Sequence, residues 1–157
     1  EIWDAKYRLK DRHSQPVDQD VGATFERVAR ALAAVEGDKA EDYIGPFFFT
    51  MEGSDTRTAF RVAEHHCNAH DSLHGGVLMA LADYTLCLCA NGGESESVAT
   101  VSCSNEFVAP AFLGDLVEGR GELIRRGGSI VFSRSTLYVA EKVVLTSSAV
   151  IKLIRKK

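Results

Sequence analysis

The residues with the clearest chemical potential lie between His65 and Cys87 of this 157-residue chain. Asp83 stands inside an apolar run that is typical of a buried helix, and that run begins at Gly75-Gly76. An ionised carboxylate is costly to bury without partners, so Asp83 is either a paired structural residue or a functional one. Glycine is a poor helix former. Two glycines in a first turn mark either a flexible helix start or a place where a carbonyl oxygen approaches the exposed N–H groups and the positive end of the helix dipole.

The spacing of these residues predicts an oligomer. Gly75 and Asp83 are eight residues apart, which is roughly 12 Å along a helix, so one carbonyl group cannot readily contact both in the same chain. Two antiparallel helices related by a twofold axis could place Gly75 of one subunit near Asp83 of the other. A catalytic interpretation of the pair therefore predicts a homo-oligomer with shared sites, either a dimer or a dimer of dimers.

Further polar side chains accompany this pair. Asn68 and His74 flank the glycine turn, and the alternation expected for the next strand predicts Thr100, Ser102 and Ser104 on one of its faces. These groups could hold a water molecule or a carbonyl oxygen near the carboxylate.

The first half of the chain is expected to contain a helix and a hairpin ahead of this stretch. Apolar residues recur at helical spacing over 21–36, and Asp18 or Asp20 can cap that helix. Alternating runs on both sides of a turn at 53–55 predict a hairpin over 45–63. The histidine-rich segment 65–72 has no periodicity and is expected to be a loop.

The second half predicts one helix followed by strands. The helix is expected over 75–90, and Asn91-Gly92-Gly93 would end it. Four long strands are expected after it, at 98–108, 116–126, 129–140 and 142–154.

These elements predict an α+β fold in one domain. The short turns between the four strands favour antiparallel neighbours. The helix at 75–90 is apolar nearly all round and should be buried. An antiparallel six-stranded sheet wrapped around this one central helix accounts for both features. The domain would span 1–157, with an N-terminal extension and additional helix over 1–40 and a core over 45–154.

Composition excludes several partners. The net charge of −4 argues against a nucleic-acid binder, which would need a basic face. No run approaches the roughly 18 apolar residues of a membrane span, so no membrane partner is expected. The four cysteines include no CxxC pair, which predicts reduced, mostly buried thiols in a cytoplasmic protein.

Two segments together resemble a known family. "HHCNAHDSLHGGVLMALAD" and "VATVSCSNEFVAPAFLGDLVEGRGELIRRGGSIVFSRSTLYV" are similar to the hotdog-fold acyl-CoA thioesterases of the phenylacetate-pathway, or PaaI-like, branch. The shared pattern is an asparagine, a short turn, His-Gly-Gly, an acidic residue eight positions after the first glycine, and a later strand followed by "EFVAPAFLGD". The resemblance covers about residues 45–154. The chain departs from it at Asp71-Ser72, where the family usually has glycine, although aspartate tolerates a left-handed turn better than most residues.

The resemblance implies hydrolysis of an acyl-CoA thioester by these residues. The Gly75 N–H, helped by Asn68 or His74, would polarise the thioester carbonyl. Asp83 from the other subunit would be the general base for water or the nucleophile, and Thr100 would help to place the water or the carboxylate. Gly76, Tyr84 and Ser102 are expected to contact the substrate. No metal and no separate cofactor are implied, because coenzyme A is part of the substrate.

Other functions remain as alternatives. His65, His66, His70, Asp71 and His74 could suggest a metal site, although they lack a defined ligand spacing. Cys67 could be a nucleophile, but nothing indicates a depressed thiol pKa. A hotdog hydratase or dehydratase, or an acyl-CoA-binding protein without activity, would share the fold, and the presence of Asp83 counts against a pure binder.

The sequence leaves the substrate contacts open. The acyl group could be aromatic or of medium chain length, and an apolar lining is available from Phe47, Phe48, Phe49, Met79 and Tyr84. The phosphates of coenzyme A could meet Arg125, Arg126, Arg155, Lys156 or Lys157. The N-terminal helix could cover the pocket or join an oligomer interface.

Overall fold

The computed structural model describes residues 15–18, 20–24, 43–52, 55–92 and 97–154. The chain divides into two compact units, Glu1–Pro46 and Phe47–Lys157. In the first unit a helix begins at Val21, where the Ala23 N–H donates to Asp20 Oδ1 at 2.8 Å. Asp20 is therefore the cap, as one of the two predicted candidates. The rest of the expected helix, from residue 25 on, lies outside the described residues.

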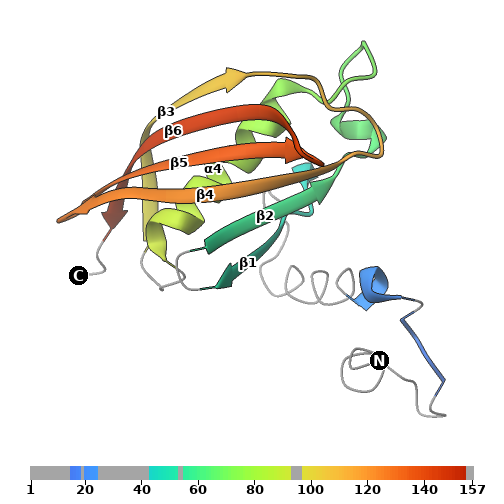
Figure 1. The fold of residues 1–157 in the computed structure, drawn as a ribbon, viewed down its shortest axis with the longest axis horizontal. Helices are drawn as coiled ribbons and strands as arrows, with labels where there is room; N and C mark the ends of the chain where they lie inside the picture. Colours follow the sequence, from blue (N-terminus) through green and yellow to red (C-terminus); the bar gives the residue numbers. More distant parts are fainter. Residues whose placement is uncertain (1–14, 19, 25–42, 53–54, 93–96, 155–157) are drawn as a thin grey trace. The chain divides into compact units, whose positions relative to one another are not determined.

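The second unit contains one antiparallel six-stranded sheet in the order β1-β2-β4-β5-β6-β3 (Figure 1). Every neighbouring pair is antiparallel. The strands are β1 (Phe48–Glu52), β2 (Asp55–Arg61), β3 (Ser97–Phe107), β4 (Leu116–Gly127), β5 (Ile130–Val139) and β6 (Lys142–Ile154). These bounds confirm the predicted strands to within a few residues. The predicted hairpin is the β1–β2 pair, and residues 53–54 of its turn lie outside the described residues.

One long helix, α4 (Gly75–Asn91), lies against the concave side of this sheet (Figure 1). It ends at Gly92, whose φ of 66° suits a residue without a side chain. The predicted arrangement of a sheet wrapped around one central helix is thus confirmed. The histidine-rich segment is more ordered than expected, since it starts with the short 3₁₀ helix η1 (Glu64–His66). No helix within the described ranges is both long and apolar enough to cross a membrane.

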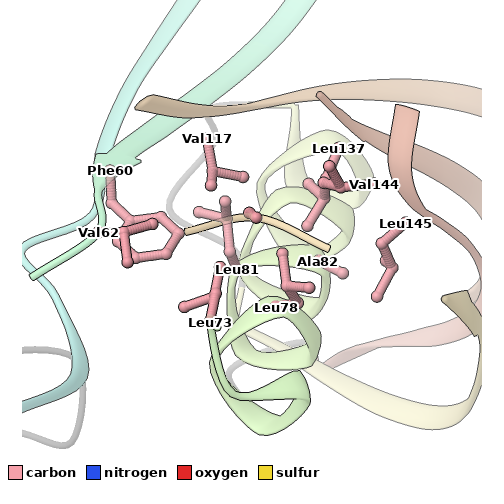
Figure 2. Packing of buried hydrophobic residues seen from close by; sticks show 11 residues of the cluster. Phe60, Val62, Leu73, Leu78, Leu81, Ala82, Val117, Leu137, Val144 and Leu145 are labelled. Atoms are coloured by element: carbon pink, nitrogen blue, oxygen red, sulfur yellow. The ribbon is translucent and has the colours of Figure 1, made fainter. Parts of the chain in front are cut away.

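The hydrophobic core fills the space between α4 and the sheet (Figure 2). Leu78, Leu81 and Ala82 on the helix pack against Phe60, Val117 and Leu137, among others, on the strands. Burial of side chains of this size contributes about 1.5–3 kcal/mol each. The same contacts determine which face of α4 points away from the sheet.

The middle of α4 packs closely against β2 and β4. Thr85 is fully buried on α4, and its hydroxyl lies 2.6 Å from that of Thr58 on β2. Because Thr85 donates to the Leu81 carbonyl, Thr58 is the donor between the two hydroxyls. Gly119 on β4 lies beside them, and a Cβ there would overlap with Thr58 Oγ1 and lie 2.9 Å from Thr85 Oγ1. The helix can approach this closely because residue 119 has no side chain.

Candidate active site

The carboxylate of Asp83 is held by a hydroxyl from the edge strand. Thr100 Oγ1 on β3 donates to Asp83 Oδ1 at 2.7 Å, across a gap of 17 residues in sequence. Asp83 is half-buried, and no described residue donates a hydrogen bond to its second oxygen, Oδ2. The structure therefore brings together the predicted pair Asp83 and Thr100, and leaves one carboxylate oxygen available.

A thiol extends this contact. Cys87 lies one helical turn after Asp83, and its Sγ is 3.4 Å from Thr100 Oγ1. Burial raises the pKa of the Cys87 thiol; the hydrogen bond with Thr100 lowers it, and the negative charge of Asp83 raises it. All four cysteines are free; Cys89 is buried and the other three are half-buried, so the prediction of mostly buried thiols holds for Cys89 alone.

The start of α4 presents one unused backbone donor. The four N–H groups at a helix start have no partners within the helix. The His74 carbonyl accepts from the N–H groups of Val77 and Leu78, and His74 Nδ1 accepts from Gly76 N–H at 2.9 Å. Among the described residues, none accepts from the N–H of Gly75. The Gly75 amide is thus free to bind a ligand atom, whereas the Gly76 amide is engaged by His74.

His74 acts here as the N-cap of α4. Since its Nδ1 accepts a hydrogen bond, the neutral ring carries its proton on Nε2. A proton on Nε2 makes that nitrogen a donor on an exposed side chain beside Gly75.

Gly75 also has a packing reason to be glycine. A Cβ at this position would lie 2.9 Å from Cε1 of Phe107, near the end of β3. Phe107 is 57% exposed, so its ring covers the helix start from the solvent side. The side of Gly75 that would carry a side chain is therefore occupied by an aromatic ring, which encloses the helix N-terminus.

The loop before the helix is organised by Asn68. Its Oδ1 accepts from the N–H of His70 at 2.8 Å, and its Nδ2 donates to Ser72 Oγ at 3.0 Å. Asp71 has a φ of 56°, so aspartate does adopt the left-handed turn expected where the family has glycine. Within one chain, the Asn68 side chain holds this loop in place.

Tyr84 lies in an aromatic group. Its ring centroid is 5.7 Å from that of Phe47 and 6.3 Å from that of Phe49 on β1. Tyr84 contacts β1 at one edge of the sheet, whereas Asp83 contacts Thr100 on β3 at the other edge, so within one chain the aromatic group and the carboxylate lie on different sides of α4. Met79, one turn before Asp83, is 43% exposed on α4.

The prediction that Thr100, Ser102 and Ser104 share one face of their strand is wrong. The register of β3 with β6 shifts between Thr100 and Ser102, because Val101 is an extra, unpaired residue. Thr100 pairs with the buried Ile151 and faces α4. Ser102 and Ser104 line a hollow of about 250 Å³ with Phe132 and Ser148, on the other face of the sheet. Ser102 is thus not brought to Asp83 within the chain.

The residues of the alternative functions are dispersed. The part of the chain that the structure describes contains no group of three or more His, Cys, Asp or Glu side chains placed to hold a metal ion. The Cys67 Sγ lies 3.7 Å from the Ala63 carbonyl oxygen. Arg125 and Arg126 lie at the exposed end of β4, and residues 155–157 lie outside the described residues.

Three residues that shape the site were not predicted from the sequence to belong to it: Cys87, Phe107 and Gly119. The i, i+4 spacing of Asp83 and Cys87 was a usable signal, since residues four apart share a helix face. Phe107 and Gly119 act through contacts between distant segments, and local patterns carry no signal for these.

Comparison with known proteins covers this same segment. A model described as "Thioesterase superfamily" matches residues 70–146. "Putative esterase PA0474" of Pseudomonas aeruginosa is 30% identical over 115 residues, covering 71% of this chain and 86% of that protein. "Acyl-coenzyme A thioesterase PaaI" of Escherichia coli K12 is 28% identical over 97 residues, covering 62% and 69%. The structure of E. coli PaaI, from the phenylacetic acid degradation operon, superposes with a TM-score of 0.71 at 20% identity, covering 85% of this chain and 98% of that chain. The range 70–146 of the family model includes Gly75, Asp83, Cys87 and Thr100.

Proposed function

Because the chain belongs to the PaaI-like branch of the hotdog thioesterase superfamily and is a thioester hydrolase, we propose that it hydrolyses acyl-CoA to a free acid and coenzyme A. The observation that carries the proposal is the hydrogen bond of 2.7 Å from Thr100 to Asp83 on the open face of α4. This hydrogen bond fixes the Asp83 carboxylate about two helical turns from the free N–H of Gly75. That arrangement supplies the two groups that thioester hydrolysis requires without a metal ion.

The proposed reaction uses the two carboxylate oxygens differently. Thr100 occupies Oδ1, so Oδ2 can accept a proton from water as that water attacks the thioester carbonyl. The carbonyl oxygen becomes an oxyanion and accepts a hydrogen bond from the Gly75 N–H at the positive end of the helix dipole. Collapse of the tetrahedral intermediate breaks the C–S bond, and the departing sulfur takes up the proton. Alternatively, Oδ2 attacks the carbonyl directly, and the C–S bond breaks to release coenzyme A, whose sulfur takes up a proton from the solvent. Water then hydrolyses the resulting anhydride.

We further propose that each site is shared between two subunits. Gly75 and Asp83 are both on α4 and, being eight positions apart, are separated by roughly 12 Å. The part of α4 around Met79, Asp83 and Cys87 is only partly covered by the chain's own sheet, since Met79 is 43% exposed and Asp83 and Cys87 are half-buried. A second copy placed antiparallel on this face would cover its apolar part and bring Gly75 of each chain towards Asp83 of the other.

The acyl group of the substrate would lie against the aromatic group of Phe47, Phe49 and Tyr84. This group offers flat, apolar contacts on the β1 side of α4. Such a surface supports an aryl or medium-chain acyl group, because aromatic rings contribute both buried area and favourable ring–ring contacts.

The test is turnover of a panel of short, medium, long and aryl acyl-CoA substrates, followed by the loss of thioester absorbance. Asp83→Asn should lower kcat at least about 10³-fold, since it removes the only proposed base or nucleophile. Asp55→Asn, an exposed carboxylate paired with Arg57, serves as the matched control and should leave kcat unchanged. Activity of Asp83→Asn close to that of the natural protein would refute the assignment, and ligand binding without turnover by the natural protein would indicate a pure binder.

Subunit mixing tests the shared site. Asp83→Asn and Gly75→Val are each expected to be inactive. In a shared site, a mixed dimer carries both defects in one site and neither in the other, so random exchange should restore about a quarter of the natural activity. Absence of recovery, with subunit exchange demonstrated independently, would place each site within one subunit.

A further inference from the structure

We propose that Cys87 is a positioning residue for the reaction: its thiol donates to Thr100 and so fixes the Thr100 hydroxyl on Asp83. This inference rests on the proposed function of Asp83. The chain of contacts is short and continuous, from Cys87 Sγ to Thr100 Oγ1 at 3.4 Å and from Thr100 Oγ1 to Asp83 Oδ1 at 2.7 Å.

Proton counting sets the direction of the chain. A threonine hydroxyl has one hydrogen atom, and Thr100 gives it to the Asp83 carboxylate. Towards Cys87 the hydroxyl oxygen can then only accept, so the hydrogen between sulfur and oxygen belongs to the thiol. Rotation of the Thr100 hydroxyl is thereby restricted by two partners on the same helix, the Cys87 thiol as donor and the Asp83 carboxylate as acceptor.

The protonation state of the thiol supports this direction. Burial is the largest influence on the pKa of Cys87 and raises it; the contact with Thr100 lowers the pKa, the negative charge of Asp83 raises it, and the net shift is upward. The thiol therefore keeps its proton near neutral pH. A thiolate beside the Asp83 carboxylate would instead compete for the single Thr100 hydrogen atom.

The local geometry explains why such a contact is needed. Thr100 lies on an edge strand, next to the bulge residue Val101, which is 61% exposed. A bulge locally disrupts the ladder, so the backbone alone restrains this hydroxyl less than in a regular central strand. Asp83 and Cys87 are four residues apart on α4, so both side chains contact Thr100 from the same helix face. The position of the Thr100 hydroxyl is therefore set by the helix as well as by the strand.

The experiment is a double-mutant cycle on the natural full chain, using the acyl-CoA of the panel that is hydrolysed fastest. Cys87→Ala should lower kcat about three- to tenfold, which corresponds to one neutral hydrogen bond, and leave KM within about twofold. Cys87→Ser keeps a donor and should stay within about twofold of the natural kcat. Cys87→Ala added to Thr100→Val should have no further effect, because the thiol acts only through the hydroxyl.

Controls separate positioning from packing. Cys103→Ala removes another half-buried thiol, one that contacts Asn105 and not Thr100, and should leave kcat unchanged. If Cys87→Ala does not fold, the nearly isosteric Cys87→Val replaces it in the cycle. An unchanged kcat in the Cys87 variants, a loss that Cys87→Ser shares, or an equal loss on the Thr100→Val background would overturn the inference. In each of these cases an inactive Asp83→Asn variant would leave the proposed function intact.

Discussion

Replacing Gly119 by alanine should weaken the contact that seats α4 on the sheet. The new Cβ would overlap with Thr58 Oγ1, lie 2.9 Å from Thr85 Oγ1 and lie 3.0 Å from Leu137 Cδ2. All three neighbours are almost fully buried, so none can move into solvent. Thr85 is also tied to the Leu81 carbonyl, which limits its rotation.

The magnitude follows from two effects. Overpacking a filled interior costs about 1–3 kcal/mol. Separating Thr58 from Thr85 leaves a buried hydroxyl without its partner, at about 1–3 kcal/mol. The better conformational entropy of alanine over glycine in a strand returns about 0.5 kcal/mol. Gly119→Ala should therefore lower the free energy of unfolding by about 3 kcal/mol.

Urea denaturation at one fixed protein concentration measures this change, since the stability of an oligomer depends on concentration. Gly127→Ala on the same strand is the matched control, because a Cβ at Gly127 meets no atom within 4 Å. Thr58→Ala combined with Gly119→Ala removes the worst overlap and should be more stable than Gly119→Ala alone. A loss below about 1 kcal/mol, or a double variant no better than the single one, would refute this account of the helix seat.

Two further predictions concern the turn and the thiols. Ala140 has a φ of 53° in the exposed turn between β5 and β6, so Ala140→Gly should raise the free energy of unfolding by about 0.5–1 kcal/mol in urea titrations; an unchanged midpoint would show that this turn is not strained. Burial raises the pKa values of Cys87, Cys89 and Cys103, so the folded chain keeps these protons at pH values where the unfolded chain has lost them. The resulting stability is complete below the unfolded thiol pKa of about 8.5 and is lost as the pH rises through the folded values. The urea midpoint should therefore fall more steeply above about pH 8.5 for the natural protein than for a variant with alanine at all three positions, and parallel curves would contradict the prediction.

The strands and the central helix could be predicted because their signals are local. Long runs of strand-forming residues defined β4, β5 and β6, and residues suited to turns separated them. Positive φ angles occur at Gly114, Gly128 and Ala140, in the connections that precede these three strands. The order of strands in the sheet could not be predicted in the same way, because it does not depend on local signals. It places β3 beside β6, and this pairing depends on contacts between residues 38 to 57 positions apart.

The candidate site was predictable only in part. Asp83 and Gly75 stand out because each is unfavourable in an apolar helix, and His74 stands out because it adjoins the glycines. The orientation of Ser102 could not be predicted, because a single extra residue at Val101 reverses which side chains face α4. Sequence alternation assumes a regular strand, and a bulge breaks that assumption without an obvious signal in residue type.

The helix itself links these results to the proposed function. Its sequence is apolar nearly all round, which predicts burial on every side, yet one chain covers only the face with Leu78, Leu81 and Leu86. One turn before Asp83, Met79 stays 43% exposed. Exposed apolar surface next to a restrained carboxylate is unfavourable in an isolated chain, but it is what a site shared between two helices requires. The remaining difference between the predicted and observed burial of α4 thus supports the same oligomer that the separation of Gly75 from Asp83 requires on geometric grounds.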